Sequence, residues 1–185
     1  PQCTPVMHSN PLFVNTSRYW ISKNELSKDF GKGWDKKWYC IFRDVTGGAS
    51  ERTLISSIIP NVATGNSISH IFFNTDNLNL STCLYANLNS IILDYIARQK
   101  VGGAHINFFI IKQFPILPPD RYTPSDITYI VPRVLELTYT SWDIKAFADD
   151  VWRDADDAMK ALLRQQWEAN KAATGGHEWK PPEWA

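Results

Sequence analysis

The chain has 185 residues, is 44% hydrophobic and 13% aromatic, and carries 19 basic and 19 acidic residues. This size and composition allow a buried core in one domain, alone or with a helical appendage. The balanced charge is not that of a nonspecific polyelectrolyte binder, but a local cluster of charge can still bind nucleic acid. No apolar run reaches the length of a membrane-spanning helix, so we expect no membrane partner.

The first half of the chain predicts a sheet. Segments 37–45, 52–60 and 67–74 are rich in aromatic and β-branched residues, and turn signals such as Gly47-Gly48 separate them. Short connections favour antiparallel pairing. We therefore expect a twisted sheet that is mostly antiparallel or mixed.

A single amphipathic helix is predicted over 84–99. Its apolar side chains recur at helical spacing on one face, which we expect to pack on the sheet: Leu84, Leu88, Ile91, Ile92, Tyr95 and Ile96. Gly102-Gly103 stops this helix. Segment 107–114 then predicts a buried strand, because the prolines of 115–119 cannot continue a hydrogen-bonded ladder.

Beyond Tyr122 the pattern becomes helical, with helices predicted over 125–137, 143–149 and 154–173 and an end to the last one at Gly175-Gly176. The predicted fold class is α+β. Its sheet-bearing domain covers 1–122, and a helical extension covers 123–185.

The three cysteines, Cys3, Cys40 and Cys83, are odd in number and irregularly spaced. This argues against a disulfide framework or a zinc site and fits a reducing compartment, so we expect a cytoplasmic protein. The chain also begins at Pro1 without a methionine, which indicates a piece of a longer protein.

The first candidate binding element is the loop 98–107. It holds the side chains that contact phosphates and base edges, and its two glycines allow a close approach of backbone to a partner. The competing interpretation makes Gly102-Gly103 a helix C-cap, with Arg98 and Lys100 stabilised at the negative end of the helix dipole. Local chemistry alone favours the C-cap interpretation.

Two further elements carry basic side chains. The turn between Arg43 and Thr53 resembles a hairpin tip that enters a groove, although Arg43 or Arg52 can equally pair with Asp44 or Glu51. Segment 30–39 interleaves lysines with aromatic residues, a pattern that suits either base stacking or a sheet core. The candidate contact residues are Lys32, Lys36, Arg43, Arg52, Thr53, Arg98, Gln99, Lys100, Gly102, Gly103, His105 and Asn107.

Catalytic interpretations find less support. Gly31-Lys32-Gly33 neither follows a strand nor opens a helix, so it is no dinucleotide fingerprint. Asp120, Asp143 and Lys145 loosely match a magnesium-dependent nuclease, but their acidic pair does not lie on adjacent predicted strands. We therefore expect no catalytic residue, metal site or cofactor in this chain.

Segments 17–22, 37–60 and 84–122 resemble the C-terminal target-recognition region of large restriction–modification adenine methylases, the type IIG-like enzymes of TaqI-type architecture. The phrases ARQKVGG-x-H-x-NFF and KQFPILPP carry much of the likeness. The resemblance implies double-stranded DNA as the partner. It also implies an N-terminal methyltransferase domain in the parent chain, with S-adenosylmethionine, and Mg²⁺ in relatives that also cut DNA.

On this resemblance the chain reads a DNA sequence and does not itself catalyse. Arginine and lysine would position the phosphate backbone, while asparagine, glutamine, histidine and some arginines would contact base edges. Two alternatives stay open. One is a protein-interaction module that docks the methylase half or another partner, and the other is the magnesium-dependent nuclease.

Overall fold

The structure is a computed structural model that describes residues 4–8, 10–16, 20–22, 24–25, 33–47 and 50–173. In chain order the elements are α1 (Pro5–His8), β1 (Trp38–Arg43), β2 (Ser56–Pro60), β3 (Ile68–Ile71), α3 (Leu78–Leu88), α4 (Ile91–Lys100), α5 (Phe108–Ile111), α6 (Pro124–Thr138), α7 (Lys145–Asp154) and α8 (Asp157–Ala173). Short 3-10 turns occupy Pro119–Arg121 and Trp142–Ile144.

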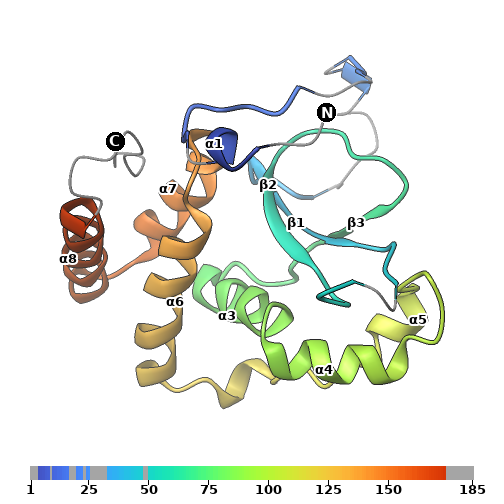
Figure 1. The fold of residues 1–185 in the computed structure, drawn as a ribbon. Helices are drawn as coiled ribbons and strands as arrows, with labels where there is room; N and C mark the ends of the chain where they lie inside the picture. Colours follow the sequence, from blue (N-terminus) through green and yellow to red (C-terminus); the bar gives the residue numbers. More distant parts are fainter. Residues whose placement is uncertain are drawn as a thin grey trace.

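Within the described residues, three strands form an antiparallel sheet in the order β2–β1–β3 (Figure 1). Cys40 in the central strand lies opposite Ile58 of β2 and Ile71 of β3. The strands are somewhat shorter than the three segments predicted from the sequence. Together with the helices they confirm the α+β fold and the antiparallel sheet.

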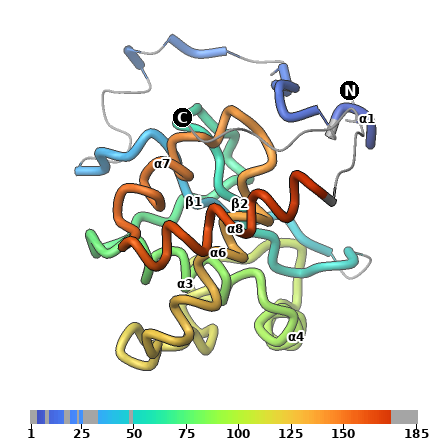
Figure 2. The backbone as a smooth tube through the Cα atoms, turned by 90° about the vertical axis from the view of Figure 1, so that its left-hand side faces the viewer, coloured from blue at the N-terminus to red at the C-terminus, as the bar shows by residue number. Residues whose placement is uncertain are grey.

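The core lies on one face of β1. Trp38, Cys40 and Phe42 are at most 2% exposed, as expected for alternate residues of a strand that share one face. Helices α3 and α6 pack against each other, and α8 packs on α6. α6 lies between α8 and the sheet (Figure 1), and α8 crosses in front of α6 in the view of Figure 2. The indole Nε1 of Trp38 donates a 2.8 Å hydrogen bond to Oδ2 of Asp150, which joins the sheet to α7.

Residues on both sides of position 122 contribute to this core. Trp38 and Phe42 precede the position, whereas Leu135, Phe147 and Val151 follow it, and all five belong to one buried cluster. The division into a domain over 1–122 and an extension over 123–185 stays a prediction. The shared core shows that the described helices beyond 122 pack directly on the sheet unit.

The single helix predicted over 84–99 is wrong. The chain forms α3 and α4 with a break at Asn89 and Ser90, because the Asn89 side chain donates to Ser56 Oγ at 2.7 Å and the Ser90 hydroxyl accepts from the Leu93 amide. The break rotates the second half of the predicted apolar face outward. Ile91 and Ile92 are 81% and 72% exposed, while Leu93 and Ala97 face the core.

The buried strand predicted over 107–114 is also wrong. Residues Phe108–Ile111 form a four-residue helix, none of whose residues is buried. β1 already has a neighbour on each side, so another strand could pair only with the outer edge of β2 or β3. The segment forms a helix instead, which shows that its tertiary context overrides its strand propensity.

The C-terminal helices match the prediction more closely. α6 begins with a capping box in which Thr123 and Asp126 satisfy each other's backbone amides, and it continues through the buried Pro132. The predicted helices over 143–149 and 154–173 correspond to α7 and α8. The predicted stop at Gly175-Gly176 lies outside the described residues.

No helix of the described ranges has the length and apolarity needed to cross a membrane.

Candidate nucleic-acid interface

The loop that follows α4 is tied to the end of β1 by backbone hydrogen bonds. Thr46 N donates to Ala104 O and Ile106 N donates to Asp44 O, both at 2.9 Å, around a bridge between Val45 and His105. The side chain of Ile106 is 1% exposed and anchors the loop in the core. The loop is therefore held by rigid parts of the fold while most of its side chains face outward.

A second tie joins the same segments through their side chains. Nδ1 of His105 lies 3.1 Å from Oδ2 of Asp44, and just over half of the His105 side chain is exposed. The carboxylate holds the imidazole in one orientation at the surface.

Two hollows adjoin the first turn of α5. The basic hollow has a volume of about 530 Å³ and is lined by residues that include Lys100, Gly102, Gly103, His105, Asn107 and Gln113. The aromatic hollow has a volume of about 710 Å³, and its lining includes Asp44, Asn66, His70, Phe72, Phe108 and Phe109. Both hollows share Asn107 and Phe109, so one bound molecule can reach both.

The C-cap interpretation of the glycine pair is not supported by the backbone. α4 ends at Lys100, Val101 occupies the C-cap position, and neither Gly102 nor Gly103 has a positive φ. A Cβ atom added to either glycine would meet nothing within 4 Å. Nothing in the described fold thus requires glycine at these two positions, which border the basic hollow.

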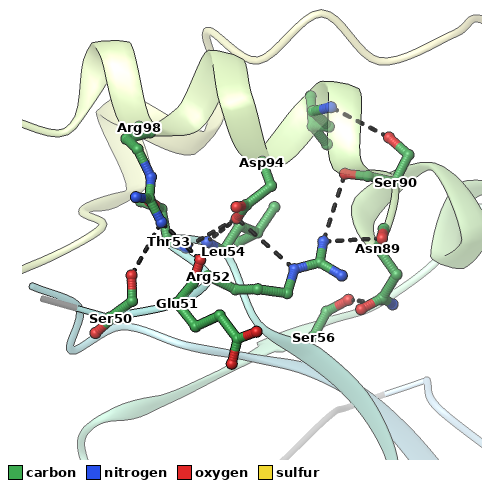
Figure 3. A network of polar contacts seen from close by, with 11 residues as sticks. Ser50, Glu51, Arg52, Thr53, Leu54, Ser56, Asn89, Ser90, Asp94 and Arg98 are labelled. Atoms are coloured by element: carbon green, nitrogen blue, oxygen red, sulfur yellow. Dashed lines mark hydrogen bonds and ion pairs between the residues drawn. The ribbon is translucent and has the colours of Figure 1, made fainter. Parts of the chain in front are cut away.

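Three of the predicted contact residues bind the fold itself (Figure 3). The guanidinium of Arg98 donates to the carbonyl oxygens of Ser50 and Glu51 at 2.9 and 2.7 Å. Arg52 donates to the carbonyl of Asn89 at 2.8 Å. Thr53 is buried, and its amide donates to Asp94 on α4. These contacts fasten the chain between β1 and β2 to α4.

The remaining predicted contact residues differ in their exposure. Gln99, Lys100, His105 and Asn107 are exposed at the end of α4 and in the loop that follows. Arg43 is half-buried, and its Nε atom is buried without a hydrogen bond to the described residues.

The two candidate lysines of segment 30–39 do not lie at the end of α4 or in the loop that follows it. Lys36 lies beside Asp35 in a separate hollow against α7. Lys32 lies outside the described residues.

The residues of the nuclease alternative do not come together. Asp120 lies just before α6, and Asp143 follows its end. A helix of 15 residues spans about 22 Å, too far for two carboxylates to share a metal ion. Lys145 is paired with Asp149 at 2.7 Å. Among the described residues, no cluster of three or more His, Cys, Asp or Glu side chains suits a metal ion.

Sequence reasoning missed two exposed phenylalanines of the interface. Phe108 and Phe109 are 64% and 63% exposed on α5, where the sequence predicted buried strand residues. Phe72, which directly follows β3, was not singled out either. A run of adjacent aromatic residues beside an asparagine is a weak signal, because most such runs are core.

Charge is distributed unevenly around the molecule. The basic hollow is lined by Lys100, and no aspartate or glutamate is among the described residues that line it. The acidic residues of α7 and of the start of α8 lie on the other side of the molecule, away from α5 (Figure 1). The acidic part of the chain is therefore separate from the candidate interface.

Comparison of the chain with protein-family models, with curated proteins and with solved structures found no match.

Proposed function

We propose that this chain is a double-stranded DNA recognition module of a restriction–modification adenine methyltransferase. The observation that carries the proposal is the loop of Lys100, Gly102, Gly103 and His105. It is fixed to the end of β1 by backbone hydrogen bonds, yet its glycines face open space. Recognition loops on a rigid scaffold commonly have this form.

The exposed side chains fit the two parts of DNA binding. Lys100 supplies a positive charge for a phosphate, and the glycines let a phosphate approach the backbone amides. Asn107 and His105 offer groups for base edges, and an asparagine can pair with adenine through two hydrogen bonds. Arg98 and Arg52 support this surface indirectly, because their guanidinium groups hold the neighbouring backbone.

The remaining activity belongs to other parts of the parent protein on this proposal. Methyl transfer, S-adenosylmethionine and any Mg²⁺ would be located in an N-terminal domain, and the whole protein would act in the cytoplasm. This chain would contribute the choice of DNA sequence.

Titration with duplex DNA at two or more salt concentrations tests the proposal. A mixed-sequence duplex should bind in low salt, and Lys100→Ala should weaken binding and lower the slope of log K against log salt by about one. Lys171→Ala, which removes the same charge from α8, is the control and should leave both values unchanged. The proposal fails if the unmodified chain does not bind duplex DNA at low salt.

A second candidate function is a protein-interaction module. It is favoured by the outer face of α4, where Ile91, Ile92 and Tyr95 are 81%, 72% and 67% exposed. Contiguous exposed apolar side chains commonly mark a protein interface. Ile92→Asp should abolish binding to the methylase half without altering DNA affinity if this face docks that domain. If Ile92→Asp weakened DNA binding but left binding to the methylase half unchanged, the docking role would be contradicted.

A further inference from the structure

The aromatic hollow combines exposed rings with a carboxylate. Phe72, Phe108 and Phe109 line it and are 43%, 64% and 63% exposed. Asp44 also lines it, and no lysine or arginine is among the described residues that do so. Aromatic rings and carboxylates both attract cations, because the face of a ring carries a negative electrostatic potential. The lining therefore suits a positively charged group.

One oxygen of the Asp44 carboxylate lacks a partner among the described residues. Oδ2 lies 3.1 Å from Nδ1 of His105, whereas Oδ1 is buried and makes no hydrogen bond to the part of the chain that the structure describes. A buried carboxylate oxygen without a partner is costly, because water no longer solvates it. The Asp44 side chain is 22% exposed, so a cation in the hollow comes close enough to offset this cost.

The imidazole of His70 adds no positive charge to the hollow. It lies nearly parallel to the ring of Phe72, with an interplanar angle of 15°. Burial lowers the pKa of His70, so the imidazole is uncharged at neutral pH and does not repel a cation. Asn66 and Asn107 also line the hollow, and each has an amide oxygen that accepts hydrogen bonds from N–H groups.

These features together favour a guanidinium over other cations. A guanidinium is planar, so it stacks on a phenyl ring, and it is less strongly hydrated than an ammonium. Its N–H groups are donors for the amide oxygens of Asn66 and Asn107 and for the carboxylate of Asp44. In a protein, such a group is the end of an arginine side chain.

The apolar surface around the hollow is larger than a single guanidinium covers. Phe108 and Phe109 are adjacent on α5, none of whose residues is buried, and the hollow has a volume of about 710 Å³. Exposed aromatic side chains of this kind are typical of protein interfaces, where arginine is also enriched. A peptide segment that carries the arginine would cover these rings as well.

We propose that the aromatic hollow binds an arginine side chain from a segment of a partner protein. The guanidinium stacks on Phe108 or Phe109 and lies beside the carboxylate of Asp44, while the rest of the segment covers the exposed rings of α5. The interaction requires neither Lys100 nor the glycine pair. It therefore stands whether or not the chain binds DNA.

A nuclear magnetic resonance titration of the full chain with the blocked peptide acetyl-Gly-Gly-Arg-Gly-Gly-amide tests the proposal. The peptide should shift the amide signals of residues 107–109, with a dissociation constant on the order of 1 mM. A matched peptide with citrulline in place of arginine has the same shape but no charge, and it should bind at least about tenfold more weakly. Free guanidinium chloride, at concentrations that do not unfold the chain, should also bind more weakly than the arginine peptide.

Two variants with matched controls locate the bound arginine. Phe108→Ala should weaken binding of the arginine peptide, and the fold should tolerate it because α5 buries no residue. Tyr129→Ala removes an exposed ring from α6 and should leave the affinity unchanged. Asp44→Asn keeps the shape of the side chain but removes its charge, and it should also weaken binding. Its control is Asp120→Asn, which removes an exposed carboxylate just before α6.

Three results would overturn the inference. The first is equal affinity for the arginine and citrulline peptides, which removes the role of charge. The second is equal affinity for free guanidinium and the arginine peptide, because the segment would then contribute nothing. The third is an affinity that persists in Phe108→Ala, with shifts confined to the acidic helices α7 and α8, which would place the arginine there.

Discussion

Oδ1 of Asp94 accepts a 2.8 Å hydrogen bond from the backbone amide of Leu54. The same oxygen accepts the amide of Thr53 at 2.9 Å and lies 4.0 Å from Nε of Arg52. Asp94 is only 6% exposed, so a carboxylate inside the fold satisfies two consecutive buried amides (Figure 3). This contact holds the segment before β2 against α4, the helix that leads to the candidate interface.

Asp94→Ala should therefore destabilise the protein strongly. Two buried amides would lose their acceptor, at a cost of about 1 to 3 kcal/mol each, so we expect a loss of about 3 kcal/mol in the free energy of unfolding. Asp94→Asn keeps an oxygen acceptor and should lose less. Denaturant unfolding measures both, and equal stability of Asp94→Ala and the unmodified chain would contradict the role assigned to the carboxylate.

Arg98 and Lys100 should respond differently to removal although both are exposed. Arg98→Ala breaks hydrogen bonds to the carbonyls of Ser50 and Glu51, and we expect a loss of about 1 kcal/mol in the free energy of unfolding. Lys100→Ala should leave stability unchanged and weaken DNA binding instead. Thermal unfolding and duplex titration of the two variants separate these roles. Loss of DNA binding by Arg98→Ala with unchanged stability would make Arg98 a direct contact.

The strands and the last helix were predictable because their signals are local. Trp38, Cys40 and Phe42 alternate along β1, and α8 carries charges that suit its dipole. The break between α3 and α4 was not predictable, because Asn89 contacts Ser56, which lies 33 residues away. Tertiary contacts of this kind override local periodicity.

The candidate site was predictable only in part, because some of its features depend on local sequence and others on tertiary contacts. The loop around Lys100 and the glycine pair is visible in the sequence. The structural role of Arg98 is not, because its partner carbonyl lies 47 residues away at Glu51. The exposure of Phe108 was hidden by a composition that is typical of strands, whereas the chain forms the short helix α5 there.

The glycine pair offers a test in which fold and binding should separate. Gly103→Ala should leave the protein as stable as before or more stable by about 0.5 kcal/mol, because φ is not positive and the added Cβ meets open space. The same methyl group should hinder a phosphate that approaches the backbone. We expect weaker duplex binding at unchanged or higher melting temperature. Unchanged affinity would remove the argument that glycine is needed here for a partner.

The contact between sheet and helices predicts how the chain responds to truncation. The Trp38 indole packs on the Phe147 ring at 5.0 Å and donates to Asp150, both of which lie beyond 122. A chain that ends at Tyr122 would expose this face, so we expect loss of cooperative unfolding and of dispersed amide resonances.

A milder variant tests the same contact within the full chain. Trp38→Phe should cost about 2 kcal/mol through the lost hydrogen bond and lost packing. Trp167→Phe on the outermost helix should cost less. Independent folding of the chain that ends at 122 would instead support a true domain boundary there.

The two buried cysteines should be unreactive in the folded protein. Cys40 and Cys83 are both 0% exposed, and burial raises the pKa of their thiols to about 12 and about 11, with the Asp126 charge contributing at Cys83. The reactive thiolate increases only as the pH approaches the pKa, so at pH 8 the Cys40 thiolate is on the order of one in ten thousand. In a Cys3→Ser background, a disulfide reagent should modify neither thiol before unfolding and both afterwards. Modification of either one in the native state, at the rate of an exposed cysteine, would contradict the burial of both thiols.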